Sequence, residues 1–287
     1  MEPTPLERAP ESLAGGRDVW LKREDVHELG AFKWRGALPT LERLRSNVVT
    51  ASTGNHGAAT AWAAQRLGLR ATVFVPAGAS ATKLALLARW GADVHAVPGD
   101  FDAAKEAAGM FAEERGLPFF EDGREPAQIG GYELIGREVL AELEPAVVVV
   151  PVGNGALAIG IAQALGERAR TIGVAAEQAP VMAESFHAGR VVESERSDTI
   201  ADGLAVRVAI PEAVEALRGT LDAFVLVSEL ELMRGVAAFH GAGIRVEAAG
   251  AAALAALPQV EADGPIVLVV TGRNIDDDLL ARLLASA

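Results

Sequence analysis

The chain has 287 residues, half of them apolar, and its 26 Lys and Arg against 39 Asp and Glu give a formal net charge of −13. This apolar share excludes the disordered and fibrous classes and suffices for one large domain or two small ones. The acidic balance argues against nucleic-acid binding, and the absence of cysteine excludes disulfides, thiolate metal sites and Cys nucleophiles.

No apolar run approaches the roughly 20 residues that a membrane-spanning helix needs. The run over residues 146–152 is among the longest. The N-terminus, Met1-Glu2-Pro3, shows no basic patch followed by an apolar segment, which is the pattern of a secretory signal. We therefore expect a cytoplasmic protein with no membrane partner.

Short β-branched runs alternate with Ala-rich and Leu-rich segments of helical spacing. The runs predict buried strands at 47–50, 71–75, 94–97, 146–152, 171–175 and 266–270. The segments predict helices over 56–67, 82–90, 102–115, 132–142, 156–169 and 230–240. Crossovers of this length join parallel strands, so we expect two doubly wound α/β domains facing a cleft: a small one over 47–124, and a large one over 1–46 plus 125–287. The polar stretch 121–126 is interpreted as their junction.

Lys33 lies between Phe32 and Trp34, just before an amphipathic segment that runs to Leu44. Apolar neighbours favour the neutral form of an amine, which can form a Schiff base with an aldehyde cofactor or a carbonyl substrate. The alternative is a structural lysine whose stem packs at the start of a helix.

A loop of small and polar residues leaves the first predicted strand and enters a helix. Ser52, Thr53 and the backbone around Gly54 suit a carboxylate, and Asn55 can offer its amide to a ring oxygen. Ser, Thr and Asn are also the preferred residues for capping a helix, so a structural role stays open.

Two further turns follow apolar strands at the edge where active sites of open α/β sheets lie. The turn at 151–157 can cradle a phosphate with backbone amides. Its Gly153, Gly155 and Ala158 also match the dinucleotide fingerprint, with Glu177 as a ribose-binding acid, which predicts a nicotinamide enzyme instead. Thr271 lies at the second turn, either facing the crevice or simply preceding a helix near Asp276.

In their order and spacing, these segments resemble the fold type II pyridoxal-phosphate enzymes, most closely the serine/threonine dehydratases and the serine racemases. The segments that carry the resemblance are 21–25, 32–37, 52–56, 150–157 and 199–205. The resemblance spans nearly the whole chain. It implies a tryptophan synthase β-like fold, with the active site in the cleft between the two domains, a large domain that binds pyridoxal 5'-phosphate, and a homodimer.

The resemblance also implies roles for individual residues. Lys33 would bond to the cofactor aldehyde, Phe32 would pack on the ring, Asn55 would bind the ring 3′ oxygen, and the hydroxyl of Thr271 would meet the pyridine nitrogen. The phosphate would be held by the turn of Gly153, Asn154, Gly155, Ala156 and Leu157, and the substrate carboxylate by Ser52, Thr53, Gly54 and His56.

The implied activity is β-elimination from a small β-hydroxy amino acid, such as L-threonine or L-serine, to a 2-oxo acid and ammonia. A neutral hydroxyl at the ring nitrogen suits elimination over transamination, and Lys33 would also remove the α-proton. Alternatives are a racemase in which Thr53 acts as the opposite-face acid or base, a β-replacement enzyme, an NAD(P)-dependent oxidoreductase, and a non-catalytic protein that binds the cofactor or an amino acid.

The sequence departs from the family pattern in four places besides Thr53. Asn154 and Ala156 interrupt a run that is commonly all glycine. Arg273 stands where a Gly is frequent, and Ala248 and Ala249 follow Glu247 where a Pro and a hydroxyl residue are frequent, which leaves the substrate open. Some relatives bind a divalent cation through an acid after the strand that ends at Glu177 and another acid six residues on. Ala183 fills that second position, so we predict no divalent metal site of that type.

Overall fold

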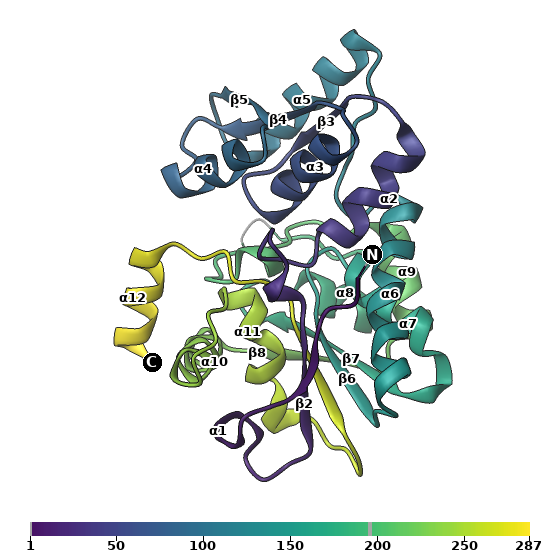
Figure 1. The fold of residues 1–287 in the computed structure, drawn as a ribbon, viewed down its shortest axis with the longest axis vertical. Coiled ribbons are helices and arrows are strands. Elements are labelled where there is room, and N and C mark those ends of the chain that lie inside the picture. The colour runs from purple at the N-terminus through teal and green to yellow at the C-terminus, as the bar shows by residue number, and fades with distance from the viewer. Residues whose placement is uncertain (1, 195–196) are drawn as a thin grey trace. The chain divides into compact units, whose positions relative to one another are not determined.

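The computed structural model of the chain describes residues 2–194 and 197–287 (Figure 1). Its contacts define two compact units: a large unit of Met1–Ala31 with Tyr132–Ala287, and a small unit of Phe32–Gly131. The small unit therefore includes the segment from Phe32 to residue 46, which the expected boundaries gave to the large domain. Lys33 consequently belongs to the small unit.

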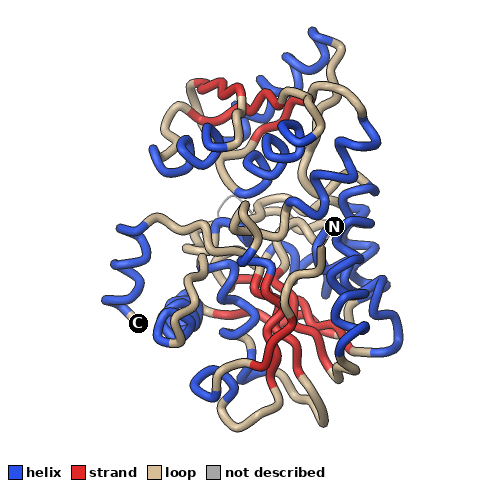
Figure 2. Tube along the Cα trace, in the orientation of Figure 1, coloured by secondary structure: helices blue, strands red, loops and turns tan. Residues whose placement is uncertain are grey.

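The small unit is a parallel sheet in the order β3-β4-β5, with helices packed against its strands (Figure 2). Helix α5 contacts β3 and β4, α3 contacts the same two strands, and α4 contacts β5. The segment around Phe119 pairs with the free side of β3, where the amide of Phe120 donates to the Val49 carbonyl at 2.8 Å. The elements are α2 (Trp34–Leu44), β3 (Val48–Ala51), α3 (Asn55–Arg66), β4 (Ala71–Pro76), α4 (Ala81–Arg89), β5 (Asp93–Val97) and α5 (Phe101–Arg115).

The sheet of the large unit has six strands among the described residues, in the order β1-β2-β9-β6-β7-β8. Every neighbouring pair is parallel except β1 with β2. The central strands β6 and β9 are buried along their whole length, which explains their unbroken β-branched and leucine sequences. The strands are β1 (Leu6–Arg8), β2 (Val19–Arg23), β6 (Val147–Pro151), β7 (Arg170–Ala176), β8 (Ala223–Val227) and β9 (Ile266–Val270).

Helices lie on both faces of this sheet (Figure 1). Helix α7 contacts β6 and β7, whereas α11 contacts β6, β7 and β9 and is itself covered by α10. The described helices of four or more residues in the large unit are α1 (Glu11–Ala14), α6 (Pro126–Glu142, which starts in the small unit), α7 (Ala156–Leu165), α8 (Val181–Ala188), α9 (Pro211–Thr220), α10 (Glu229–Gly241), α11 (Ala248–Ala255) and α12 (Asp277–Ser286). Among the residues described, none of the helices combines the length and the apolar character that crossing a bilayer requires.

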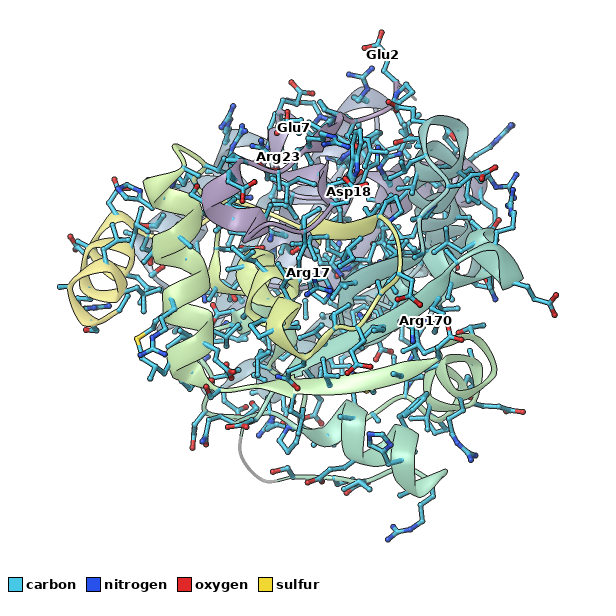
Figure 3. The ribbon with its side chains drawn as sticks, turned by 90° about the horizontal axis from the view of Figure 1, so that it is seen from below. Glu2, Glu7, Arg17, Asp18, Arg23 and Arg170 are labelled. Atoms are coloured by element: carbon cyan, nitrogen blue, oxygen red, sulfur yellow. The ribbon has the colours of Figure 1, made fainter. Side chains whose placement is uncertain are left out.

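Polar contacts secure the edge formed by β1 and β2. On the exposed side, the Arg23 guanidinium contacts the Glu7 carboxylate at 2.5 Å (Figure 3). On the buried side, the fully buried Nζ of Lys22 donates to Glu138 Oε2 and to the Thr4 carbonyl, both at 2.6 Å. A buried ammonium requires such partners, so Lys22 ties the N-terminal segment and β2 to α6.

The predicted α/β fold with parallel sheets is confirmed, and all predicted strands are present within two residues of their expected ends. Strands β1, β2 and β8 were not predicted. β1 and β2 carry charged residues, and β8 is only half buried. Helix α6 begins at Pro126 rather than at residue 132, because the stretch interpreted as a junction enters the helix directly.

Candidate functional site

Lys33 is the residue that precedes α2, and its amine is held by a carboxylate. Nζ donates to Asp122 Oδ2 at 2.6 Å and lies 4.9 Å from the centre of the Phe32 ring. The Lys33 side chain is 14% exposed. The amine is therefore fixed in place, and its side chain still reaches the surface of the small unit.

Asp122 follows the segment that pairs with β3. Its Oδ1 accepts from Gln128 Nε2 at 2.6 Å, and Gln128 Oε1 in turn accepts from the Gly123 amide at 2.7 Å. Burial disfavours the charged carboxylate, but Lys33 and His56 outweigh it and hold the pKa of Asp122 well below its ordinary value. Asp122 is therefore an oriented anion.

His56, in the first turn of α3, lies on the other side of this carboxylate. Its Nε2 is 3.1 Å from Thr50 Oγ1 and 3.2 Å from the Phe120 carbonyl. The Thr50 hydroxyl donates to the same carbonyl at 2.7 Å, so both groups accept from Nε2–H, and Nδ1 faces Asp122 Oδ1 at 3.5 Å. Burial lowers the pKa of His56, although Asp122 opposes this effect.

The loop between β3 and α3 is compact. Ser52 is buried and its Oγ accepts from the Gly54 amide at 3.2 Å, whereas Thr53, Gly54 and Asn55 are partly exposed. A Cβ on Gly57 would lie 2.9 Å from the Ser52 carbonyl oxygen, so only glycine lets the helix start this close to the loop. The small unit thus brings together Phe32, Lys33, Ser52, Thr53, Gly54, Asn55 and His56.

The large unit carries the turn between β6 and α7. Gly155 has φ +96°, and a Cβ on Gly153 would lie 2.2 Å from the Gly203 carbonyl oxygen. The Asn154 side chain accepts from the Ala156 amide at 3.1 Å. Within the described ranges, the amides of Asn154 and Gly155 form no hydrogen bond to the protein. The turn is therefore a glycine-dependent cradle with amides available to an anion.

Thr271 lies immediately after β9 in the large unit and is 3% exposed. The next residue, Gly272, is fixed on both sides: its carbonyl accepts from the Glu247 amide at 3.0 Å, and it forms a bridge with Ala31. A Cβ on Gly272 would lie 2.5 Å from Glu247 Oε1. Thr271 is therefore held at the carboxyl end of a central strand.

Arg273, one of the departures from the family pattern, and Glu247, which precedes another, have a structural role in this segment. The Arg273 amide donates to the Gly30 carbonyl at 2.8 Å, and its guanidinium is 3.4 Å from the His27 carbonyl oxygen. Glu247 precedes α11 and packs against Gly272. Both residues thus help to hold the strand end on which Thr271 lies.

The sequence-based interpretation missed Asp122, Gln128 and Gly203. Asp122 and Gln128 lie in or next to the polar stretch that was interpreted as a junction, and their spacing gives no catalytic pattern. A charged residue among polar neighbours usually indicates an exposed loop, and only the pairing of residues 118–120 with β3 brings Asp122 to Lys33. Gly203 lay in a segment already noted for its resemblance, but nothing in the sequence connects it to Gly153.

The sequence matches the family described as pyridoxal-phosphate dependent enzyme over residues 1–272, and the chain belongs to this family. The L-threonine ammonia-lyase of Geobacter sulfurreducens is 37% identical over 274 residues, which are 91% of this chain and 68% of that protein. The processed form of threonine deaminase isoform 2 from Solanum lycopersicum superposes with a TM-score of 0.92 at 30% identity, covering 99% of this chain and 88% of that one. Maize serine racemase superposes with a TM-score of 0.90 at 25% identity, covering 98% and 91%.

The residues present fit the family's cofactor, pyridoxal phosphate, rather than a nicotinamide dinucleotide. Lys33 offers a primary amine for an aldehyde, and the Asn154 and Gly155 amides, which bond to no protein group among the described residues, can meet a phosphate. Thr271 offers a neutral hydroxyl for a ring nitrogen. Each of these groups is chemically suited to one polar end of the cofactor, namely the aldehyde, the phosphate or the ring nitrogen.

Proposed function

We propose that the protein is a pyridoxal-phosphate-dependent ammonia-lyase that converts a small β-hydroxy amino acid, L-threonine or L-serine, to a 2-oxo acid and ammonia. The observation that carries this proposal is the 37% identity, over 91% of the chain, to an L-threonine ammonia-lyase. For L-threonine the products are 2-oxobutanoate and ammonia. The water lost from Cα and Cβ is taken up again when the amino group leaves, so the reaction needs no other reactant.

When bound, pyridoxal phosphate supplies an aldehyde that bonds to amines and a ring that accepts the electron pair left at Cα. Lys33 is the amine proposed to bond to that aldehyde, and Phe32 beside it is proposed to pack on the ring. Lys33 would also be the base that removes the Cα proton of the substrate. The contact at 2.6 Å between Lys33 Nζ and Asp122 Oδ2 orients the amine for these roles, which it performs after it has lost its proton.

The remaining roles concern binding. The amides of the turn at Gly153, Asn154, Gly155, Ala156 and Leu157 are proposed to hold the phosphate, Asn55 the ring oxygen, and Thr271 the ring nitrogen. Ser52, Thr53, Gly54 and His56 are proposed to bind the substrate carboxylate, His56 through its backbone amide because both of its ring nitrogens face protein groups. The glycine-dependent shape of the turn and the partly exposed loop after β3 support these assignments.

Racemisation of the same amino acids is a second proposed activity. It is supported by the TM-score of 0.90 to maize serine racemase and by the hydroxyl of Thr53, which the family resemblance implies as the acid or base on the face opposite Lys33.

The lyase is tested by the absorption spectrum of the purified protein, recorded with pyridoxal phosphate before and after L-threonine, together with an assay for 2-oxobutanoate. We expect a visible band of the lysine-bound cofactor that changes with substrate, and oxo-acid production. Lys33→Ala and Lys33→Arg should abolish both, because neither offers a primary amine, while Lys83→Ala should retain both. A band without oxo acid would indicate a binding protein or another reaction, and no band at all would contradict the roles of these residues.

We further propose a homodimer, as the family resemblance implies, and light scattering coupled to size-exclusion chromatography tests it. A mass of one chain, about 29.8 kDa, would contradict it. A cytoplasmic location stays a prediction from the sequence.

A further inference from the structure

One carboxylate, that of Asp122, contacts two basic side chains that the sequence places far apart. Oδ2 accepts from Lys33 Nζ at 2.6 Å, and Oδ1 faces His56 Nδ1 at 3.5 Å. Both contacts lie within the small unit. Because the two oxygens belong to one group, the charge on Lys33 and the charge on His56 depend on the same anion.

The Asp122 carboxylate is fixed in an orientation that faces both Lys33 and His56. Gln128 is fully buried, is oriented by the Gly123 amide, and donates to Oδ1 at 2.6 Å. The backbone before Asp122 is fixed to β3 by the Phe120 amide and by the Thr50 hydroxyl. The carboxylate therefore keeps its orientation when either basic partner changes its charge.

His56 can hold a second proton only toward Asp122. Its Nε2–H is used by Thr50 and Phe120, which leaves a lone pair on Nδ1 directed at Oδ1 when the ring is neutral. Protonation of Nδ1 turns this contact into an ion pair. The charged groups that act on His56 are Asp122 and Glu121, which favour the proton, and Lys33, which disfavours it.

We propose that Asp122 is a positioning residue that shares one positive charge between Lys33 and His56, so that His56 gains affinity for a proton when the Lys33 amine loses its charge. This inference rests on the proposed function, in which Lys33 must become neutral to bond to an aldehyde or to take a proton. When Lys33 is neutral, the protonated His56 ring remains paired with the Asp122 carboxylate. The loss of charge on Lys33 therefore does not leave that carboxylate unpaired. Asp122 touches Lys33 and acts through it.

The test is an NMR titration of ¹⁵N-histidine-labelled, cofactor-free protein, with the His56 signal assigned by its loss in His56→Gln. Asp122→Asn should lower the pKa of His56 and Lys33→Ala should raise it, each by about one pH unit. Glu125→Gln removes a carboxylate three residues away that pairs with Arg43, and it should leave the titration unchanged. In the Asp122→Asn background, Lys33→Ala should have a smaller effect than in the wild type.

Shifts in the same direction, or no shift in variants whose circular dichroism matches the wild type, would overturn the proposal. If Lys33→Ala does not fold, Lys33→Gln provides the same loss of charge with a longer side chain. A protein without lyase activity that still shows opposite shifts would refute the proposed function and leave the shared charge intact. A functional lyase without opposite shifts would refute the shared charge alone.

As a second readout, reductive methylation of Lys33 in the cofactor-free protein is followed by mass spectrometry. The contact with Asp122 holds the Lys33 amine, which must leave this contact before it can attack formaldehyde. We expect at least threefold faster labelling of Lys33 in Asp122→Asn, and unchanged labelling in Glu125→Gln. Equal rates in Asp122→Asn and the wild type would overturn the proposal.

Discussion

Gly153 and Gly203 lie in backbone contact in the large unit. A Cβ atom on Gly153 would lie 2.2 Å from the Gly203 carbonyl oxygen, a distance that no side chain can occupy. The turn after β6 is therefore shaped by the short helical turn at 202–204 as well as by its own glycines. The cradle is a property of two segments about fifty residues apart in the sequence.

Gly153→Ala should consequently disturb the turn, because the obstructing atom is backbone and cannot rotate away. We expect a loss of about 1–3 kcal/mol in the free energy of unfolding, and weaker binding of pyridoxal phosphate in a fluorescence titration. Gly109→Ala is the matched control. Gly109 lies inside α5. Apart from its chain neighbours and the backbone of its own helix, no atom among the described residues lies within 4 Å of an added Cβ. The substitution should therefore stabilise the protein by about 0.5–1 kcal/mol. Equal stability of the two variants would contradict the contact.

The buried ion pair of Lys22 and Glu138 predicts an asymmetric effect on stability. Glu138→Gln leaves a fully buried ammonium without its counter-charge and should cost about 3–5 kcal/mol in denaturant unfolding. Arg137→Gln, one position away, breaks an exposed pair with Glu133 and should cost no more than about 0.5 kcal/mol. Similar losses in the two variants would show that Lys22 finds another partner.

His56 predicts a pH dependence of stability. Burial, opposed by Asp122, lowers its pKa below the ordinary 6.5, so the unfolded chain takes up a proton at a higher pH than the folded one. The stabilising contribution of His56 to the free energy of unfolding is present above pH 6.5. It is lost as the pH falls toward the pKa of His56 in the folded protein, by up to about 1.4 kcal/mol per pH unit. The free energy of unfolding, measured with urea between pH 8 and 5, should change less steeply with pH in His56→Gln than in the wild type. Equal dependence of the unfolding free energy on pH in His56→Gln and the wild type would contradict this prediction.

Thr53 predicts a separation of racemisation from elimination. If its hydroxyl handles the proton on the face opposite Lys33, Thr53→Ala should reduce conversion of L-serine to D-serine by about 100-fold while oxo-acid production persists. Thr53→Ser keeps the hydroxyl and should retain the conversion, as measured by chiral chromatography. Equal L-to-D rates in wild type and Thr53→Ala would refute this role.

The parallel core was predictable because it is buried on both faces. Strands such as β6 and β9 must be apolar at every position, and that pattern is visible without a structure. β2 was missed because Lys22 and Arg23 interrupt its pattern, and their charges are satisfied only by distant residues such as Glu138 and Glu7. The burial of a charged residue thus cannot be predicted from the sequence until its partner is known.

The same reason limits prediction of the site. Lys33, the Ser52–His56 loop and the Gly153 turn stand in motifs whose local sequence suggests chemistry. Asp122 stands in a stretch whose composition suggests a linker, and it acquires a role only through pairing of residues 118–120 with β3 and through Gln128. Contacts between segments far apart in the sequence follow from tertiary structure and are absent from any local pattern.

Strand β2 (Val19–Arg23) is flanked in the sheet by β1 and by β9 (Ile266–Val270), which follows the other described strands in chain order. During translation, β1 and β2 must therefore wait for almost the entire chain before they can join the large sheet. The small unit, by contrast, is one uninterrupted segment and can form as soon as it leaves the ribosome. A ribosome that stalls before residue 266 therefore leaves the edge of β2 exposed to chaperones and to other chains.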